Sequence, residues 1–238
     1  NLGSGTMTVT DSTLNINTQS VSNSFVGLDG RSGGTNELTL DNSTLTMGVA
    51  GATTGRFHVG NRSTGVMNVT NGSTVYLPEN LYAGVYDAET SGSLRPRGNG
   101  TVNVTGDGSS VTVRNVTRLG DSGTGAMTVS DGGQFTSPTI QVGIFAPAIG
   151  TLNVTGSGSR VTATTIVAGE RGTGTINVSA GGQLTGNLYQ IGYDYSTATG
   201  TGTLNVTDGG LVTATDLYAG VWGGATGTIN VTGSGSSV

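Results

Sequence analysis

The chain has 238 residues, of which 10% are charged, 5% are aromatic and 44 are glycine. Its formal net charge is -5 and it contains no lysine and no basic run, which disfavours nucleic-acid binding because that requires a positive surface. Cysteine is absent, which excludes disulfides and thiolate metal sites. Val, Thr and Ile are abundant and favour pleated surfaces, so we expect ordered all-β structure rather than disorder.

An internal repeat organises the sequence. Phrases such as "GTLNVTGSGSRVTATTIVAG" at 150–169 recur about every 25 residues, with longer insertions in places. The first apolar residue of each repeat marks nine starts, at Met7, Leu38, Met67, Val102, Met127, Leu152, Ile176, Leu204 and Ile229.

Within one repeat, apolar residues alternate with polar ones at period two, which is the spacing of a strand with one buried face. Leu152 and Val154 share one face of the first strand in the repeat at 150–169. Two further alternating pairs follow them, namely Val161 with Ala163 and Ile166 with Ala168. The repeat therefore predicts three short strands.

A single coil of three strands cannot bury its apolar face, so coils must stack on one another. Crossovers between parallel strands are right-handed, and we therefore expect an all-β, right-handed parallel β-helix of roughly nine coils. An antiparallel sandwich would also contain short alternating strands, but it would not require the same inward positions to recur. We expect residues 1–238 to form one rod, an uncapped part of a longer solenoid.

Turns such as "TDGG" and "TGSG" need residues that tolerate a positive φ. Acidic or amide residues occur in the turn after the first strand, where carboxylates could bind calcium. Neighbouring repeats carry Gly or Ala at this position and the acids do not cluster as calcium requires, so we expect turn caps and no metal or cofactor. The residues concerned are Asp11, Asp41, Asn71, Asp131 and Asp208.

Several repeats share a longer pattern, including "GTVNVTGDGSSVTV" at Gly100, "GAMTVSDGGQFT" at Gly125 and "GTINVSAGGQLTG" at Gly174. With these motifs the chain resembles the β-helical passenger domains of bacterial autotransporters and related repeat-containing surface adhesins. The resemblance implies export across an outer membrane, a cell-surface or extracellular location, and roles in adhesion, self-association or biofilm formation. The chain lacks the translocator barrel of that family, so we expect membrane attachment only through a region outside it.

Some parallel β-helices degrade polysaccharides, which requires two carboxylates on a shared surface. Acids here fall at turns and insertions, such as Asp107 and Glu170, and no strand position carries them in adjacent coils. The single histidine, His58, is predicted to point outward between inward Phe57 and Val59, as a surface residue rather than a catalytic base. We therefore expect no catalytic residue and no enzyme. A polysaccharide-degrading enzyme and a passive structural spacer stay open as alternatives.

The outward side of each first strand carries hydroxyl and amide groups. On stacked coils these groups form a flat, uncharged grid, which serves either solubility and stacking or attachment to an identical rod through many weak hydrogen bonds. The central asparagine departs from the threonine arrays of ice-binding β-solenoids. The candidate self-association ladder consists of Thr101, Asn103, Thr105, Thr151, Asn153, Thr155, Thr175, Asn177, Thr203, Asn205, Thr207, Thr228 and Asn230.

Four insertions follow the third strand of a repeat and are expected along one edge of the rod, at 85–99, 144–149, 193–201 and 221–226. Their aromatic rings either pack over the corner or recognise a surface glycan or protein. Tyr82 and Tyr218 are expected to point outward just before the same edge. The candidate ligand edge consists of Tyr86, Arg95, Arg97, Phe145, Tyr193, Tyr195 and Trp222.

Overall fold

The strands form where apolar and polar residues alternate. In β16 (Ile149–Thr155), Leu152 and Val154 are completely buried, whereas Thr151 and Asn153 are half-buried. Successive side chains of a strand point to opposite faces, so a period-two sequence produces one apolar and one polar side. The strands predicted from this alternation are confirmed.

The computed structural model describes residues 4–16, 25–29, 34–48, 56–85, 97–194 and 199–238. Within these residues every helix or strand element is a β-strand, and there are 25 of them. All strand pairs are parallel, and the strands form three sheets of nine, eight and eight strands. The first sheet consists of β1 (Gly5–Thr10), β4 (Thr35–Asp41), β7 (Thr64–Thr70), β10 (Asn99–Thr105), β13 (Thr124–Ser130), β16, β19 (Thr173–Ser179), β22 (Thr201–Thr207) and β25 (Thr226–Thr232).

The second and third sheets take the second and third strand of each coil. The second sheet consists of β2 (Thr13–Ile16), β5 (Thr44–Met47), β8 (Thr74–Leu77), β11 (Ser110–Val113), β14 (Gln134–Thr136), β17 (Arg160–Thr162), β20 (Gln183–Thr185) and β23 (Leu211–Thr213). The third consists of β3 (Phe25–Asp29), β6 (Arg56–Asn61), β9 (Asn80–Val85), β12 (Val116–Leu119), β15 (Thr139–Val142), β18 (Thr165–Ala168), β21 (Leu188–Tyr193) and β24 (Asp216–Val221).

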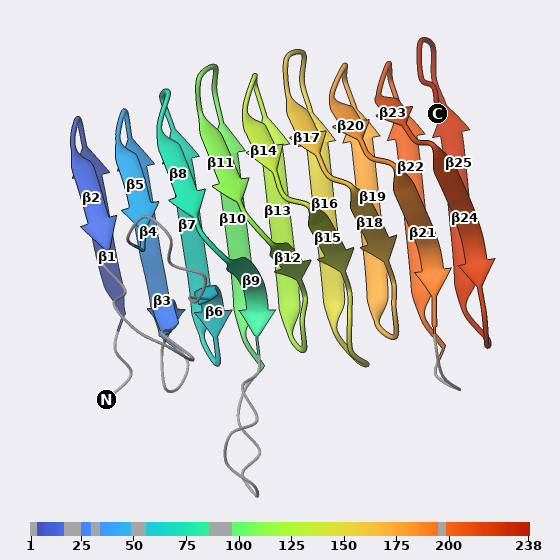
Figure 1. Cartoon of the computed structure of the whole chain (residues 1–238), viewed down its shortest axis with the longest axis horizontal. Coiled ribbons are helices and arrows are strands. Elements are labelled where there is room, and N and C mark those ends of the chain that lie inside the picture. Colours follow the sequence, from blue (N-terminus) through green and yellow to red (C-terminus); the bar gives the residue numbers. More distant parts are fainter. Residues whose placement is uncertain (1–3, 17–24, 30–33, 49–55, 86–96, 195–198) are drawn as a thin grey trace, which may run out of the picture.

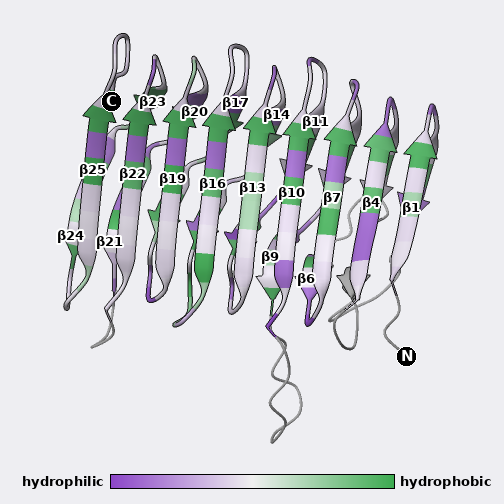
Figure 2. Cartoon of the chain, turned by 180° about the vertical axis from the view of Figure 1, so that it is seen from behind, coloured by the Kyte–Doolittle hydropathy of each residue, from purple (hydrophilic) through white to green (hydrophobic). Residues whose placement is uncertain are grey.

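The chain therefore completes eight three-stranded coils and begins a ninth with β25. It runs along the first sheet, returns along the other two on the opposite side, and then advances by one coil toward the C-terminus (Figures 1 and 2). The sense of this winding is right-handed, as expected from the chirality of parallel crossovers. The predicted parallel β-helix is confirmed.

In the first sheet the register between coils follows the repeat without a break, whereas in the third sheet it shifts once, between Leu28 and Asp29 of β3. Leu152 pairs with Met127 on one side and with Ile176 on the other, and all nine predicted repeat starts lie in one column of the first sheet. The residue two positions after each repeat start forms a second column, which is valine in most coils. Six of its valines within the rod have no exposed surface, namely Val69, Val104, Val129, Val154, Val178 and Val206. Each buried valine contributes about 1.5–3 kcal/mol of hydrophobic stabilisation.

The core residues of the outermost described coils are more exposed, because a neighbouring coil covers them on one side only. Met7 of β1 is 48% exposed and Val231 of β25 is 46% exposed, whereas their equivalents within the rod are buried.

Two columns of glycine bring the third sheet close to the first at one corner of each coil. Gly143 has a φ of 71°, and a Cβ there would overlap the carbonyl oxygen of Thr173, the first residue of β19 two coils further on. A Cβ on Gly150, which lies next to it, would overlap the backbone nitrogen of Gly143. This close approach explains why most repeats end and begin with glycine, although Asn36 takes the first-strand position in β4. Positive φ recurs at the equivalent Gly60, Gly84, Gly120, Gly169, Gly192 and Gly220.

The turn after the first strand contains the left-handed residues expected there. Asp11, Asn71, Asp131 and Asp208 all have φ between 48° and 53°. The prediction for Asp41 is wrong, because the register pairs Asp41 with the last residue of β1, Thr10. Asn42 takes the turn position instead, with a φ of 44°, and its side-chain amide donates to the Asp11 carboxylate across the coils.

A buried serine supports the same turn from the next coil. The hydroxyl oxygen of Ser159 accepts the backbone N–H of Gly132 at 3.1 Å, and both residues are buried. Equivalent bonds join Gly72 to Ser109 and Gly209 to Ser236. A "GSGS" turn thus stabilises a "DGG" turn in the preceding coil, because its serine hydroxyl accepts the backbone N–H of the glycine after the aspartate.

Replacing Ser159 by alanine is expected to lower the free energy of unfolding by about 1–3 kcal/mol, because the buried N–H of Gly132 loses its acceptor. Urea denaturation followed by circular dichroism measures the change. Ser157→Ala is the matched control, since Ser157 is exposed in the same turn and is expected to change stability by less than about 0.5 kcal/mol. Equal effects of the two substitutions would contradict the role given to Ser159.

Candidate functional site

The candidate self-association ladder lies on the outward face of the first sheet. From β10 to β22, every residue of the ladder is half-buried, while the residues between them are buried. In β25, where no described strand covers the far edge, Thr228 and Asn230 are exposed. The face has three columns, in which Thr151, Asn153 and Thr155 of β16 pair in register with Thr175, Asn177 and Ser179 of β19.

The central asparagines hydrogen-bond to one another along the rod. The side-chain amide of Asn177 donates to the side-chain oxygen of Asn153 at 2.8 Å, and that of Asn205 donates to Asn177 at 2.9 Å. Asn230 donates in turn to Asn205 at 2.8 Å. Such a ladder holds each side chain in one orientation and stabilises the stacking of coils. Asn177, Asn205 and Asn230 each donate one amide N–H to the ladder, and an asparagine amide has two.

The ladder reaches further toward the N-terminus than predicted. Asn103 donates to the side chain of Asn68 in β7, and Asn68 donates to the Glu37 carboxylate of β4 at 2.8 Å and to the Thr39 hydroxyl. The phrase "GVMNVT" around Asn68 matches the repeat, so this member could have been recognised from the sequence.

The ladder is interrupted at β13. Thr128 stands in the asparagine column there and Ala126 in the first threonine column, so both side chains are shorter than their neighbours. Asn153 reaches the Thr128 hydroxyl only at 3.4 Å. Figure 2 shows the same interruption, since a hydrophilic band crosses β16, β19, β22 and β25 but is missing from β13.

The outward face of the second sheet carries a threonine column that the sequence reasoning did not single out. It arises from the threonine that follows the buried residue of the second strand, in "VT", "FT" or "LT", and its register is continuous with Tyr76 of β8. The column consists of Thr112, Thr136, Thr162, Thr185 and Thr213.

The candidate ligand edge lies where the third sheet connects to the first, but its side chains do not share one environment. Arg97 donates to the backbone carbonyl of Ser122 at 2.8 Å, and Phe145 is half-buried under the guanidinium of Arg171, 4.5 Å from the ring centroid. Trp222 is 73% exposed and has a φ of 69°. Tyr86, Arg95 and Tyr195 lie outside the described residues.

Tyr193 does not belong to an exposed edge. It is only 7% exposed, because it ends β21 at the corner and packs into it instead of projecting from the insertion. Of the described aromatic residues of the edge, only Trp222 presents its ring to solvent.

The predicted surface position of His58 is wrong. His58 and Tyr82 point outward from the third sheet, yet they are only 2% and 8% exposed. Their rings stack at 5.6 Å, and the guanidinium groups of Arg56 and Arg118 lie 5.6 Å and 5.0 Å from the Tyr82 ring. Coils are only about 4.8 Å apart, so large side chains of adjacent coils cover one another even on an outward face.

The structure brings together carboxylates that are far apart in the sequence. Arg118 forms an ion pair with Asp121 at 2.8 Å and donates to Gln141, whose amide donates to Glu170 at 3.0 Å. Burial raises the pKa of Glu170, and nearby Arg171 and Arg118 oppose the rise while Asp194 and Asp121 add to it. Asp121 and Asp194 are themselves buried, at 8% and 0% exposed, so this network mainly joins three coils at the corner. In the described part of the chain, no three His, Asp or Glu side chains are grouped to hold a metal ion.

Comparisons of the chain with protein-family models, with curated proteins and with solved structures found no match. Among the residues that the structure describes, no helix is long and apolar enough to cross a membrane.

Breaking the asparagine ladder is expected to destabilise the rod. Asn177→Ala removes one bond that Asn177 donates and one that it accepts, which predicts a loss of about 2 kcal/mol in the free energy of unfolding. Thr175→Ala is the control on the same strand and is expected to cost less than about 0.5 kcal/mol. If both variants unfold at the same urea concentration, the ladder contributes nothing to stability.

The raised pKa of Glu170 predicts a pH dependence of stability. The folded state favours the protonated acid, so this stabilisation is present below the ordinary glutamate pKa of 4.5 and is lost as the pH rises through the higher pKa of the folded state. The free energy of unfolding of the wild type, measured relative to Glu170→Gln, is therefore expected to fall over that range. Urea titrations at a series of pH values check this, and a difference that grows with pH would contradict it.

Proposed function

We propose that the chain is an adhesive or self-associating β-helical stalk of an exported bacterial surface protein, and that two copies meet through the outward face of the first sheet. The observation that carries the proposal is the uncharged, hydrogen-bonding grid on that face. From β7 to β25 no outward residue of the first sheet is charged.

The absence of charge matters because the chain carries a net charge of -5. Two copies that approach through other surfaces bring like charges together, which is unfavourable over distances up to about 10 Å at ordinary salt. The second sheet carries Arg160 on its outward side, and the third sheet carries Arg118 and Asp216. The first sheet is therefore the side on which two copies can approach with the least repulsion.

The ladder also lowers the cost of association. Its asparagines are already held in place by one another, so little side-chain freedom is lost when a partner docks. A hydrogen bond to the partner contributes only about 1 kcal/mol, but the grid repeats along the coils and many such bonds form together. This mode of binding fits the adhesive role that the resemblance to autotransporter passenger domains implies.

The export and surface location rest on the repeat motifs and on the absence of cysteine, which removes the risk of a premature disulfide during translocation.

A passive spacer is the second candidate, and one observation favours it. The asparagine amides bind each other, so the ladder has a structural role whether or not a partner exists. A polysaccharide-degrading enzyme has weaker support, since Asp121 and Asp194 are buried within the corner network and do not line an open surface with Glu170. Self-association is therefore the property to measure first.

Sedimentation velocity over a concentration series tests the proposal. The wild type is expected to associate, and Thr151→Lys with Thr203→Lys is expected to keep it monomeric by placing two charges on the grid. These positions are chosen because the central asparagines Asn153, Asn177 and Asn205 keep their mutual bonds when the flanking threonines are changed.

The matched control is Thr162→Lys with Thr213→Lys, which adds the same two charges to the same coils on the second sheet. This variant is expected to associate as the wild type does. A wild type that is monomeric at every concentration, or a control that dissociates as fully as the test variant, would reject the first sheet as the interface.

A further inference from the structure

We propose a binding site for a neutral sugar residue in a hollow at the corner of the rod where the second sheet connects to the third. The hollow measures about 250 Å³ and is lined by Pro78, Glu79, Arg114 and Asn115. At about 30 Å³ per molecule it holds roughly eight waters, which is enough room for a single sugar ring. It is distinct from both the candidate ladder and the candidate ligand edge.

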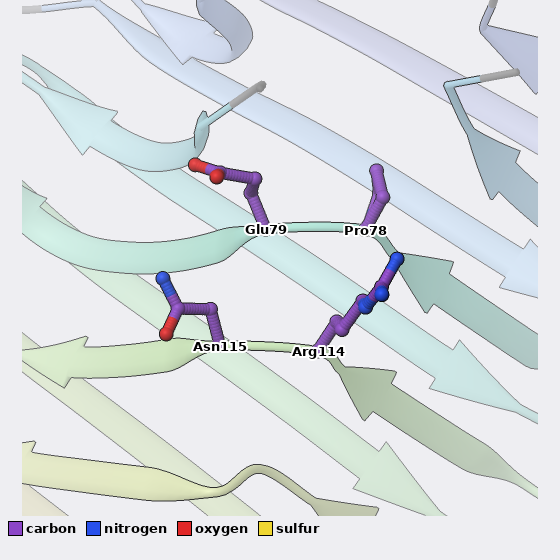
Figure 3. A pocket seen from close by; sticks show the side chains of 4 residues that line it. All are labelled: Pro78, Glu79, Arg114 and Asn115. Carbon is purple, nitrogen blue, oxygen red and sulfur yellow. The ribbon is translucent and has the colours of Figure 1, made fainter. Parts of the chain in front are cut away.

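Two consecutive coils build the hollow. Pro78 and Glu79 connect β8 to β9, and Arg114 and Asn115 connect β11 to β12. Figure 3 shows Glu79 beside Asn115 at one end of the hollow and Pro78 near Arg114 at the other. The corner is rigid, because the backbone N–H of Asn115 donates to the carbonyl of Glu79 at 2.9 Å and that of Arg114 donates to the carbonyl of Leu77 at 3.0 Å.

The Glu79 carboxylate is held in place while one of its oxygens stays available. The amide of Asn80, which is 7% exposed, donates to Oε2 of Glu79 at 3.1 Å, and its own oxygen accepts the backbone N–H of Val116. Oε1 of Glu79 makes no such bond among the described residues, and neither do the side chains of Arg114 and Asn115. The hollow thus presents a fixed acceptor, a guanidinium donor and an amide that can do both.

This corner differs from those of the following coils. There the two connecting residues are Ser137–Pro138, Ala163–Thr164, Gly186–Asn187 and Ala214–Thr215, none of which is charged. The buried first residue of the first three of these corners follows the threonine of the second strand as buried Val113 does, so Arg114 is an additional, exposed residue of its corner. Since the repeat needs no charge at this corner, Glu79 and Arg114 are not explained by the coil itself.

The charges decide the class of ligand. A carboxylate ligand would be attracted by Arg114 but repelled by Glu79. A protonated amine would be attracted by Glu79 but repelled by Arg114. Neighbouring hydroxyl groups fit all three polar groups, because a hydroxyl donates to Glu79 and accepts from Asn115 or Arg114. The hollow therefore suits an uncharged residue of a glycan.

Saturation-transfer NMR and calorimetric titration with the methyl glycosides of glucose, galactose and mannose test this site. At least one neutral glycoside is expected to bind with a Kd of roughly 1 mM, and the anionic methyl glucuronide to bind more weakly. Glu79→Gln and Asn115→Ala are each expected to weaken binding by about tenfold, since each loses a hydrogen bond to the sugar.

Asn187→Ala is the matched control, because Asn187 occupies the same position of a later corner, where its backbone N–H bonds to Thr164 of the preceding coil. It is expected to leave binding unchanged. The site is rejected if no neutral glycoside shows saturation transfer, if Glu79→Gln and Asn115→Ala bind as the wild type does, or if methyl glucuronide binds more tightly than the neutral glycosides.

The site does not depend on self-association through the first sheet. Asn115→Ala is expected to sediment as the wild type does, so the two proposals can fail separately.

Discussion

Parallel pairing between equivalent strands of successive coils is the constraint on which the rest of the structure depends. Because Leu152 stands next to Met127 and Ile176, each position of the repeat becomes a column along the rod. A residue type that recurs in the sequence therefore acts as a set of neighbours in space. The valine core, the glycine corners, the serine-supported turns and the asparagine ladder all arise in this way, and each stabilises the register that produces it.

The same constraint prepares surfaces for binding. Columns of asparagine and threonine leave the first sheet uncharged from β7 to β25, while most charged groups gather at turns, corners and the third sheet. A face that is both held by internal hydrogen bonds and free of repulsion suits repeated weak contacts with another copy. Departures from the repeat identify different properties, since among the described residues the side chains of Glu79 and Arg114 form no hydrogen bond between coils and line the hollow between two of them.

Alternation in the sequence fails as a guide to exposure where large side chains meet. His58 and Tyr82 occupy the predicted outward positions, yet both are buried. Their rings stack on each other, and Arg56 and Arg118 from the two coils beside Tyr82 cover its ring. Tyr193 is covered in a similar way at its corner. The period-two pattern indicates which side of a strand a residue is on, but not what the adjacent coils place over it.

The sequence by itself determined the strands, their order in three parallel sheets and the register of nearly every coil, because a repeat that must stack has one arrangement that buries all its apolar positions. It also located the asparagine column, whose members share one place in the phrase. Only the tertiary structure decided which polar groups meet across coils. Glu170 and Asp121 lie far apart in the sequence and become neighbours through the winding of the chain. Exposure and hydrogen bonding depend on those contacts, and a single repeat carries no record of them.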